Sequence, residues 1–447
     1  MHSPSTTSAW PPELTRSLLL AALAVGAVFF ITEHNIFISR AQDYTQDAEE
    51  MLETVQGGNT LRRLAFLSFA TLGIGLLIAS RRIPLQRPTW QGVLMVSTIA
   101  LAFASVLWSH DRGLCLRRLF VLGLTLTGMF GVARRFSLKE LCFFALTISL
   151  SCAVIGLACE LALGTFRPWS GDYRFSGTVH PNTQGAYLAT LCFAALCLSF
   201  ADAPRRNWYW ALLAAGVVLL VLTKSRTSTA GTVASLGCVG LMLSPLRLRV
   251  MTPLLFAFLA ASGLLALLLG GVDADALLAK VAFMGRQEET ESFSGRTTIW
   301  PVVQRYIDQR FWLGYGFESF WNAESIEAVS ADCEWGVREA HSAYRDMLLS
   351  LGVIGLTMYL LTVLSGMLTA WVEFITRREV CALFWTGMIL NGLFNGMFES
   401  GMAWVSFPTF MIAAGLARLV LFQPAASPCS ASSEEVWQPQ WSLGGSV

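Results

Sequence analysis

The sequence predicts an all-helical membrane protein that crosses the bilayer about twelve times. Three observations support this fold class: the composition, the length of the apolar runs, and the alternation of charge between them. Of the 447 residues, 54% are hydrophobic and only 14% are charged, and the mean hydropathy is +0.55. Soluble domains have about 25% charged residues, so this chain has too few polar side chains to cover several such domains. Its main solvent is therefore expected to be lipid.

Twelve apolar runs are candidates for spans, since a helix needs about 20 mostly apolar residues to cross the hydrocarbon core. In lipid the backbone must satisfy its own hydrogen bonds, and the runs are too long for barrel strands, so helices are expected. The runs are 17–32, 64–80, 88–109, 119–133, 141–159, 183–201, 207–223, 227–246, 250–272, 347–372, 380–398 and 400–417. The first lacks a clear cleavage site, so we expect a span there and not a cleaved leader.

Basic residues alternate between the connecting loops and indicate the orientation of the chain, because cytoplasmic loops are rich in Lys and Arg. The short basic loops carry Arg81, Arg82 and Arg87; Arg134, Arg135 and Lys139; Arg205 and Arg206; Arg247 and Arg249; and Arg377 and Arg378. Both termini are therefore predicted to be cytoplasmic, and the long loop 273–341, with short helices, to face outward. Residues 1–422 are expected to form one membrane domain, and the Ser-, Pro- and Gly-rich residues 423–447 a disordered cytoplasmic tail.

Charge and cysteine content exclude several classes of function. The 31 basic and 30 acidic residues nearly cancel, so the composition indicates no nucleic acid partner. Most of the ten cysteines lie inside apolar runs, and no CxxC pair occurs, so neither a zinc or redox motif nor a disulfide framework is supported. The outward loops contain no acidic metal-binding motif. We therefore predict neither a metal site nor a cofactor.

One histidine and three arginines in the outward loops are candidates for chemistry. Arg174 lies in the Gly-rich loop GDYRFSGTVHPN, Arg226 in KSRTS between two adjacent runs, and Arg296 in SGRTTIW at the start of a helix. Ionisable groups near the membrane boundary are costly, so such residues are functional unless they anchor to lipid headgroups. His341 stands at the mouth of the tenth run, and imidazole suits proton transfer near neutral pH. Together they indicate a site that binds an anionic substrate and transfers a proton.

Aromatic residues are concentrated in the large outward loop. Trp300 lies on the apolar stripe of a predicted helix, and Tyr315 lies in the segment FWLGYGFESFW. Aromatic rings suit the apolar C–H faces of sugars, although they are also common at any membrane interface. We take Trp300 and Tyr315 as candidate substrate-binding residues.

Five segments, taken in order, resemble the O-antigen ligase and polymerase superfamily, including its exopolysaccharide-polymerase branch. They are LWSHDRGLCLRRL, RFSGTVHPNTQGAYL, LTKSRTSTAG, GRTTIWPVVQRYIDQRFWLGYGFESFW and AHSAYRDMLLSLGVIGL, within residues 101–421. The resemblance implies a membrane glycosyltransferase of the C type in the bacterial inner membrane, with its active site facing the periplasm. It also implies metal-independent transfer of a glycan from undecaprenyl pyrophosphate to an acceptor hydroxyl.

The same resemblance implies roles for individual residues. The arginines of the family's SR and GR motifs correspond to Arg226 and Arg296, and its catalytic histidine to His341. Where the family often has Asn after the histidine, this chain has Ser342. Three residues match the family's loop before the sixth span and are candidate substrate-binding residues: Arg174, His180 and Asn182.

The sequence leaves several functions open. A polymerase would transfer the glycan to another lipid-linked repeat unit, whereas a ligase would transfer it to lipid A core or another terminal acceptor. The segments WSHDRGLCLRR and LGYGFESFW favour the polymerase. A lipid-linked glycan transporter is less favoured because charges are scarce within the runs, and a purely structural subunit is the simplest alternative. Expected partners are the lipid-linked donor, a glycan or lipid A core acceptor, membrane lipid, and polysaccharide export or chain-length machinery.

Overall fold

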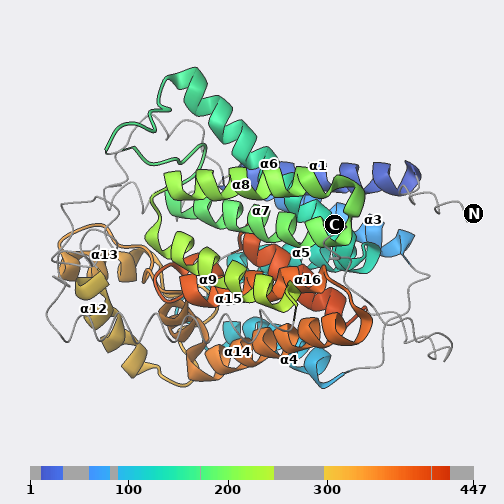
Figure 1. Cartoon of the computed structure of the whole chain (residues 1–447). Helices are drawn as coiled ribbons and strands as arrows, with labels where there is room; N and C mark the ends of the chain where they lie inside the picture. The colour runs from blue at the N-terminus through green and yellow to red at the C-terminus, as the bar shows by residue number, and fades with distance from the viewer. Residues whose placement is uncertain are drawn as a thin grey trace, which may run out of the picture.

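The computed structural model is a bundle of helices, and every regular element in the part of the chain it describes is helical. It describes residues 12–33, 60–80, 89–171, 173–245, 296–403 and 405–422. The long helices lie side by side, while α12 (Arg296–Gln309) and α13 (Ala323–Cys333) lie together beyond one end of the bundle (Figure 1). We call this end the site end.

Eleven of the twelve predicted runs coincide with helices, and the run 250–272 lies outside the described residues. These helices are α1 (Pro12–Glu33), α3 (Thr60–Ala79), α4 (Trp90–Ala104) with η2 (Ser105–Leu107), α5 (Arg112–Arg135), α6 (Leu138–Leu163), α7 (Pro181–Ala201), α8 (Arg206–Leu222), α9 (Arg226–Leu243), α14 (Ala343–Arg377), α15 (Ala382–Asn395), and η4 (Ser400–Met402) with α16 (Phe407–Val420). A short turn, η3 (Ala203–Arg205), joins α7 to α8.

Among the described residues, six helices are long and apolar enough to cross a membrane: α3, α4 with η2, α5, α6, α7 and α14. The structure thus confirms an all-helical, multi-pass membrane protein. The basic loops at 81–87 and 247–249, the loop segment 273–295 and the tail 423–447 lie outside the described residues.

Helix α16 runs opposite to both α1 and α4, as contacts between their ends show. The amide of Phe407, at the start of α16, donates to Glu33 Oε1 at the end of α1, over 2.6 Å. At the opposite end of the bundle, the hydroxyl of Thr89, just before α4, donates to the carbonyl of Val420 at the end of α16, over 3.4 Å. Helix α7 runs through the centre of the bundle, and 83% of an apolar 18-residue stretch of this helix is buried. The loops that meet at the site end therefore come from distant parts of the sequence.

The long helix α14 is broken at Gly352, and the loop that follows α12 fills the break. Gly352 has φ 64° and ψ −169°, so the backbone groups on either side lose their helical partners. The loop replaces those partners: Tyr315 N donates to Leu349 O (2.7 Å), Gly316 N to Ser350 O (2.9 Å) and Val353 N to Phe311 O (2.9 Å). Polar backbone freed within a membrane helix must find such partners in neighbouring protein. The break therefore fixes the loop after α12 against the start of α14.

Helices α3 and α5 contact each other backbone to backbone. A Cβ on Gly73 would lie 2.4 Å from the carbonyl oxygen of Thr127, and a Cβ on Gly131 would lie 2.4 Å from that of Gly73. Small residues permit such close approach between membrane helices. Both helices begin at the site end, where Arg62 of α3 interacts electrostatically with Glu33 and with Glu318 of the loop after α12. The two helices are therefore parallel.

Candidate active site

Arg296, the first residue of α12, is held by the turn that follows α15. Its Nη2 lies 2.8 Å from Glu399 Oε1, and its Nη2 and Nε donate to the carbonyl of Phe398 over 2.6 and 3.0 Å. The two charged side chains are only 13% and 20% exposed. Burial raises the pKa of Glu399, although Arg296 opposes that shift by favouring the carboxylate. The guanidinium is thus fixed in direction by three hydrogen bonds.

Asn182 extends this network into the loop before α7. Its Nδ2 donates to the same oxygen of Glu399 over 2.9 Å, and its Oδ1 accepts from Arg174 Nη2 over 3.0 Å. Arg174 Nε in turn donates to the carbonyl of Thr223 over 3.0 Å. Arg174, Asn182, Glu399 and Arg296 therefore form one continuous chain of hydrogen bonds across the site end.

The loop that carries Arg174 is organised by a buried carboxylate, Glu160, near the end of α6. Its oxygens accept hydrogen bonds from the hydroxyl of Tyr173 (2.5 Å) and from the amides of Ser176 (2.9 Å) and Gly177 (2.7 Å). With these partners the carboxylate is satisfied inside the protein. Glu160 therefore has a structural role, and its donors fix the loop beside Asn182.

Arg226 begins α9 next to the same loop. The preceding Ser225 donates its hydroxyl to Ser228 (3.0 Å), and Ser228 donates to the carbonyl of Asn182 (3.4 Å). The free amides at the start of a helix attract anions, and a guanidinium at that position adds a full positive charge. The turn before α9 thus places the half-buried Arg226 beside the Arg174–Asn182 pair.

His341 lies in the turn before α14 and pairs with Glu339. Its Nδ1 is 3.0 Å from Glu339 Oε1, and its ring stacks on Trp335 with the centroids 6.3 Å apart. Burial lowers the pKa of His341, but the hydrogen bond and charge of Glu339, with the charge of Glu399, outweigh it and raise the pKa above its usual value. Burial likewise acts to raise the pKa of Glu339, yet its bond to His341 brings the pKa below the usual value. An Nδ1–H donated to Glu339 leaves Nε2 free to accept a proton.

Neighbouring residues hold this turn in place. Trp300 Nε1 donates to the carbonyl of Ala340 over 3.1 Å, and the amide of Ala340 donates to Asp346 Oδ1, also over 3.1 Å. Ser342, the residue where the family often has Asn, is buried and donates its hydroxyl to the carbonyl of Gly396 over 3.3 Å. Ser342 therefore fastens the histidine turn to the end of α15.

The structure brings most of the predicted site residues to one region: Arg174, His180, Asn182, Arg226, Arg296, Trp300 and His341. His180 caps α7, since its Nδ1 accepts from the amide of Asn182 over 3.3 Å, and it interacts electrostatically with Glu339. Tyr315 is not part of this group. It is only 7% exposed, and its hydroxyl donates to the carbonyl of Tyr306 over 3.0 Å, so it packs the interior of the loop after α12.

Three residues of the site were not predicted: Glu339, Glu399 and Trp335. Glu339 could have been noticed, because it lies two residues before the histidine in the segment REAHS. Glu399 meets Arg296 and Asn182 only through the fold, and nothing in its own segment indicates these partners.

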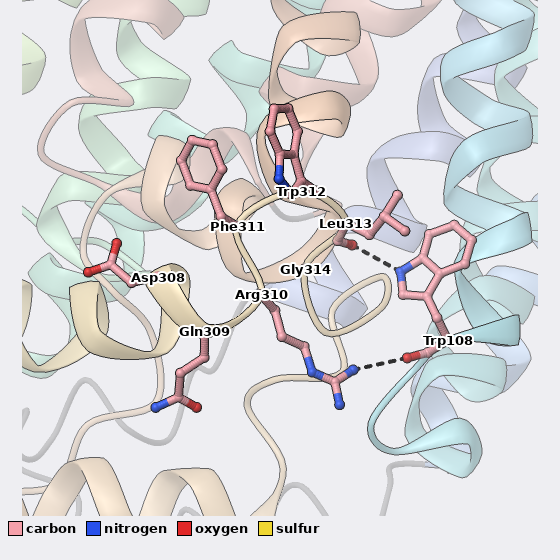
Figure 2. Close-up of a pocket in the computed structure, with 8 residues that line it drawn as sticks. All are labelled: Trp108, Asp308, Gln309, Arg310, Phe311, Trp312, Leu313 and Gly314. Carbon is pink, nitrogen blue, oxygen red and sulfur yellow. Dashed lines mark hydrogen bonds between the residues drawn. The ribbon is translucent and has the colours of Figure 1, made fainter.

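A pocket of about 390 Å³ lies at the same end of the bundle, where the end of α12 approaches Trp108. Figure 2 shows two hydrogen bonds at its edge: Trp108 Nε1 donates to the carbonyl of Leu313 (2.9 Å), and Arg310 Nη1 donates to the main-chain carbonyl of Trp108 (3.3 Å). Its lining combines aromatic with charged and amide side chains: Trp108, Asp308, Gln309, Arg310, Phe311, Trp312, Leu313 and Gly314. Such a mixture suits a polyhydroxylated ring better than a purely apolar ligand.

Within the described ranges, no group of three or more His, Cys, Asp or Glu side chains is placed to hold a metal ion.

A family model described as O-antigen ligase matches residues 211–360 of this chain. The matched segment contains Arg226, Arg296 and His341. No curated protein matches the chain. Residues 211–360 are thus similar to the O-antigen ligase family, which confirms the resemblance of this membrane protein to the O-antigen ligase and polymerase superfamily.

Proposed function

We propose that this protein transfers a glycan from undecaprenyl pyrophosphate to an acceptor hydroxyl, and so polymerises the repeat units of a surface polysaccharide. The observation that carries the proposal is the hydrogen-bonded chain from Arg174 through Asn182 and Glu399 to Arg296, with the His341–Glu339 pair beside it. Fixed cations suit an anionic leaving group, and the paired histidine suits a hydroxyl that must lose a proton. The family match supports this class of reaction.

Arg226 and Arg296 act on the leaving group. When the glycosyl–oxygen bond breaks, the pyrophosphate keeps the electron pair and gains negative charge. Guanidinium groups match phosphate oxygens with paired donors and stay protonated at all relevant pH values. Glu399 and the Phe398 carbonyl hold Arg296 in position before the substrate arrives. The loss of one such preorganised contact typically lowers the rate by about 10²–10³.

His341 acts on the acceptor. Its Nε2 takes the proton of the acceptor hydroxyl as the oxygen attacks the anomeric carbon, and Glu339 fixes the tautomer by accepting Nδ1–H. General-base catalysis of this kind typically accelerates a reaction by roughly 10²–10⁴-fold. Attack from the face opposite the pyrophosphate inverts the configuration at the anomeric carbon. The arginines supply the positive charge that the reaction needs, so the proposed transfer is metal-independent.

The proposal includes the placement of the protein in the bacterial inner membrane. Twelve spans with both termini in the cytoplasm would put the site end, and with it His341, in the periplasm. The opposed directions of α16 and of α1 and α4, with the alternating basic loops of the sequence, support this topology. The pocket beside Trp108 would then lie outside the membrane, where the growing glycan could rest against it.

The second candidate is an O-antigen ligase, and the description of the matching family model favours it. Against it, the segments WSHDRGLCLRR and LGYGFESFW are closer to the polymerase branch. Purified protein supplied with an undecaprenyl-pyrophosphate-linked repeat unit separates the two. Longer lipid-linked chains are expected from a polymerase, whereas transfer only after addition of lipid A core would identify a ligase. Movement of the lipid across liposomes without a new glycosidic bond would contradict both and indicate a transporter.

A further inference from the structure

Trp335, between α13 and the histidine turn, stacks on His341 but has no role in the chemistry proposed above. The two rings are nearly parallel, with an angle of 16° between their planes, and their centroids are 6.3 Å apart. At this distance parallel rings are offset, so the indole extends past the imidazole and covers only part of it. Trp335 is 41% exposed. The structure therefore presents a flat apolar ring directly beside the histidine.

The segment that carries Trp335 is held in shape at both ends. Glu334, the C-cap of α13, and His341 both have a left-handed backbone, with φ 63° and 48°. This conformation is uncommon for residues other than glycine and persists only where the surrounding structure fixes it. Between the two, the amide of Val337 donates to Ser330 Oγ over 2.9 Å, and Val337 is buried. The indole is therefore fixed relative to the imidazole before a ligand arrives.

Two other tryptophans show how a purely structural indole is placed in this chain. Trp321 is 4% exposed and donates Nε1 to Asp346 over 2.8 Å. Trp385 is fully buried and donates Nε1 to a backbone carbonyl over 2.8 Å. Trp335 differs, since a large part of its ring faces solvent. Its contact with His341 uses one part of the indole and does not account for the exposed remainder.

The surroundings of Trp335 are those of a protein surface in water. Tryptophans are common at membrane interfaces, where apolar helices end. Trp335 instead follows α13, which lies beyond the end of the bundle (Figure 1) and exposes three acidic side chains: Glu324, Glu327 and Asp332. Anionic lipid headgroups would repel these carboxylates. A ligand that stacks on Trp335 is therefore expected to be a water-soluble group with one apolar face.

A sugar ring is such a group, because it has an apolar face of C–H bonds and hydroxyl groups around its rim. The side chains near Trp335 suit those hydroxyls. Glu339 Oε1 lies 3.0 Å from His341 Nδ1, and a carboxylate has further acceptor positions for a hydroxyl. His180 interacts electrostatically with Glu339 and so lies in the same region. An aromatic face bordered by carboxylate and imidazole side chains matches a sugar.

We propose that Trp335 binds the acceptor by stacking its indole on the C–H face of the sugar ring that carries the attacking hydroxyl. This inference rests on the proposed function, in which His341 Nε2 takes the proton of that hydroxyl. Since Nδ1 faces Glu339, Nε2 lies on the other side of the imidazole, where a hydroxyl can meet it. The pyrophosphate of the donor is assigned to Arg226 and Arg296, so the sugar beside the histidine belongs to the acceptor.

The first test measures binding and needs no activity. The probe is the repeat-unit oligosaccharide released by mild acid from the cells' own lipid-linked glycan, which has neither lipid nor pyrophosphate. Full-length wild type and variants in detergent are compared by saturation-transfer NMR. We expect the Kd to rise about ten-fold in Trp335→Leu and to stay within about three-fold of wild type in Trp335→Phe, which keeps a flat ring. The matched control is Trp169→Leu, at an 81% exposed tryptophan in the loop before α7, and it should bind like wild type.

The wild-type spectrum alone is a further check that does not depend on a variant that folds. The strongest transfer is expected at the C–H protons on one face of the terminal sugar, and uniform or absent transfer would overturn the inference. Wild-type affinity in Trp335→Leu, an equal loss in Trp335→Phe, or the same loss in Trp169→Leu would also overturn it. Wild type that still forms glycosidic bonds would keep the proposed function in each case, so the two failures are distinguishable.

The second test separates sugar binding from simple support of the histidine. The donor has its own terminal hydroxyl methylated, so that it cannot act as an acceptor. In Trp335→Leu we expect the acceptor KM to rise about ten-fold, while kcat and the acidic limb of the pH–rate profile stay close to those of wild type. An indole that only held His341 in place would lower kcat and move that limb at an unchanged acceptor KM, and this result would contradict the proposal.

Discussion

At the scale of single residues, the chemistry depends on how His341 and its neighbours share charge. Glu339 and Glu399 stabilise the imidazolium, whereas burial and Arg296 oppose it. The balance raises the pKa of His341 above its ordinary value of 6.5. A general base must be neutral before it accepts a proton, so the transfer rate is expected to rise as the pH passes this raised pKa.

Replacing Glu339 by Gln tests this balance. Gln keeps the size and an oxygen acceptor for Nδ1–H but removes the negative charge, so the pKa of His341 should fall. The acidic limb of the pH–rate profile is then expected to move to lower pH. Glu334→Gln, an exposed position in the same loop, serves as the control and should leave the profile unchanged. A limb that stays in place or moves to higher pH in Glu339→Gln would contradict the role given to this pair.

Single residues also show what the sequence could and could not predict. Arg226, Arg296 and His341 were found because charged groups stand out beside apolar runs and because their motifs resemble a family. Glu399 was missed, since its contact with Arg296 depends on how the turn after α15 meets the start of α12. The aromatic segment predicts a substrate-binding role for Tyr315, but a sequence does not show whether an aromatic ring in a loop faces outward or inward. The structure buries it under α12.

At the scale of elements, the break in α14 is the feature that positions the site. The apolar runs predicted nearly all the helices, because length and hydropathy suffice for a helix in lipid. They did not predict the break, since LLSLGVIGL reads as a continuous span. The loop that satisfies the broken backbone lies before α13, far from Gly352 in the sequence, so only the fold reveals the pairing.

Gly352→Ala is expected to be strongly destabilising. The residue has φ 64°, and a Cβ there would lie 2.3 Å from the carbonyl carbon and oxygen of Trp312, which belong to backbone and cannot yield easily. Strain of this kind costs about 1–3 kcal/mol before the steric clash is added. Gly75→Ala in α3, where nothing lies within 4 Å of the added carbon, should be neutral or slightly stabilising. Thermal unfolding in detergent, followed by tryptophan fluorescence, measures both, and equal Tm values would contradict this account of the break.

At the scale of the whole molecule, loops from distant parts of the chain meet at one end of the bundle. Arg174, Arg226, Arg296 and His341 follow or precede different helices, yet all lie at the site end. Charge alternation in the sequence had predicted a shared outward face for them. The contacts within that face required the structure, because each loop alone specifies neither its neighbours nor their distances.

The proposed topology has a direct test in reporter fusions. A phosphatase that is active only in the periplasm is inserted after Trp169, in the exposed loop that carries Arg174, or after Arg205, at the opposite end of the bundle. We expect activity from the first fusion and none from the second, because the two positions are separated by α7. Activity from the Arg205 fusion alone would show that the site end faces the cytoplasm.

The measurement that tests the central claim most directly is glycan transfer by purified protein, with an undecaprenyl-pyrophosphate-linked repeat unit and no added metal. Wild type, His341→Ala and Arg296→Lys are compared, with His110→Ala as a surface-histidine control at the site end. We predict new glycosidic bonds from wild type and His110→Ala. The His341 variant should be slower by about 10²–10⁴, and the Arg296 variant by about 10²–10³. Near-normal transfer by His341→Ala, or none by wild type with either a lipid-linked or a lipid A core acceptor, would contradict the proposed chemistry.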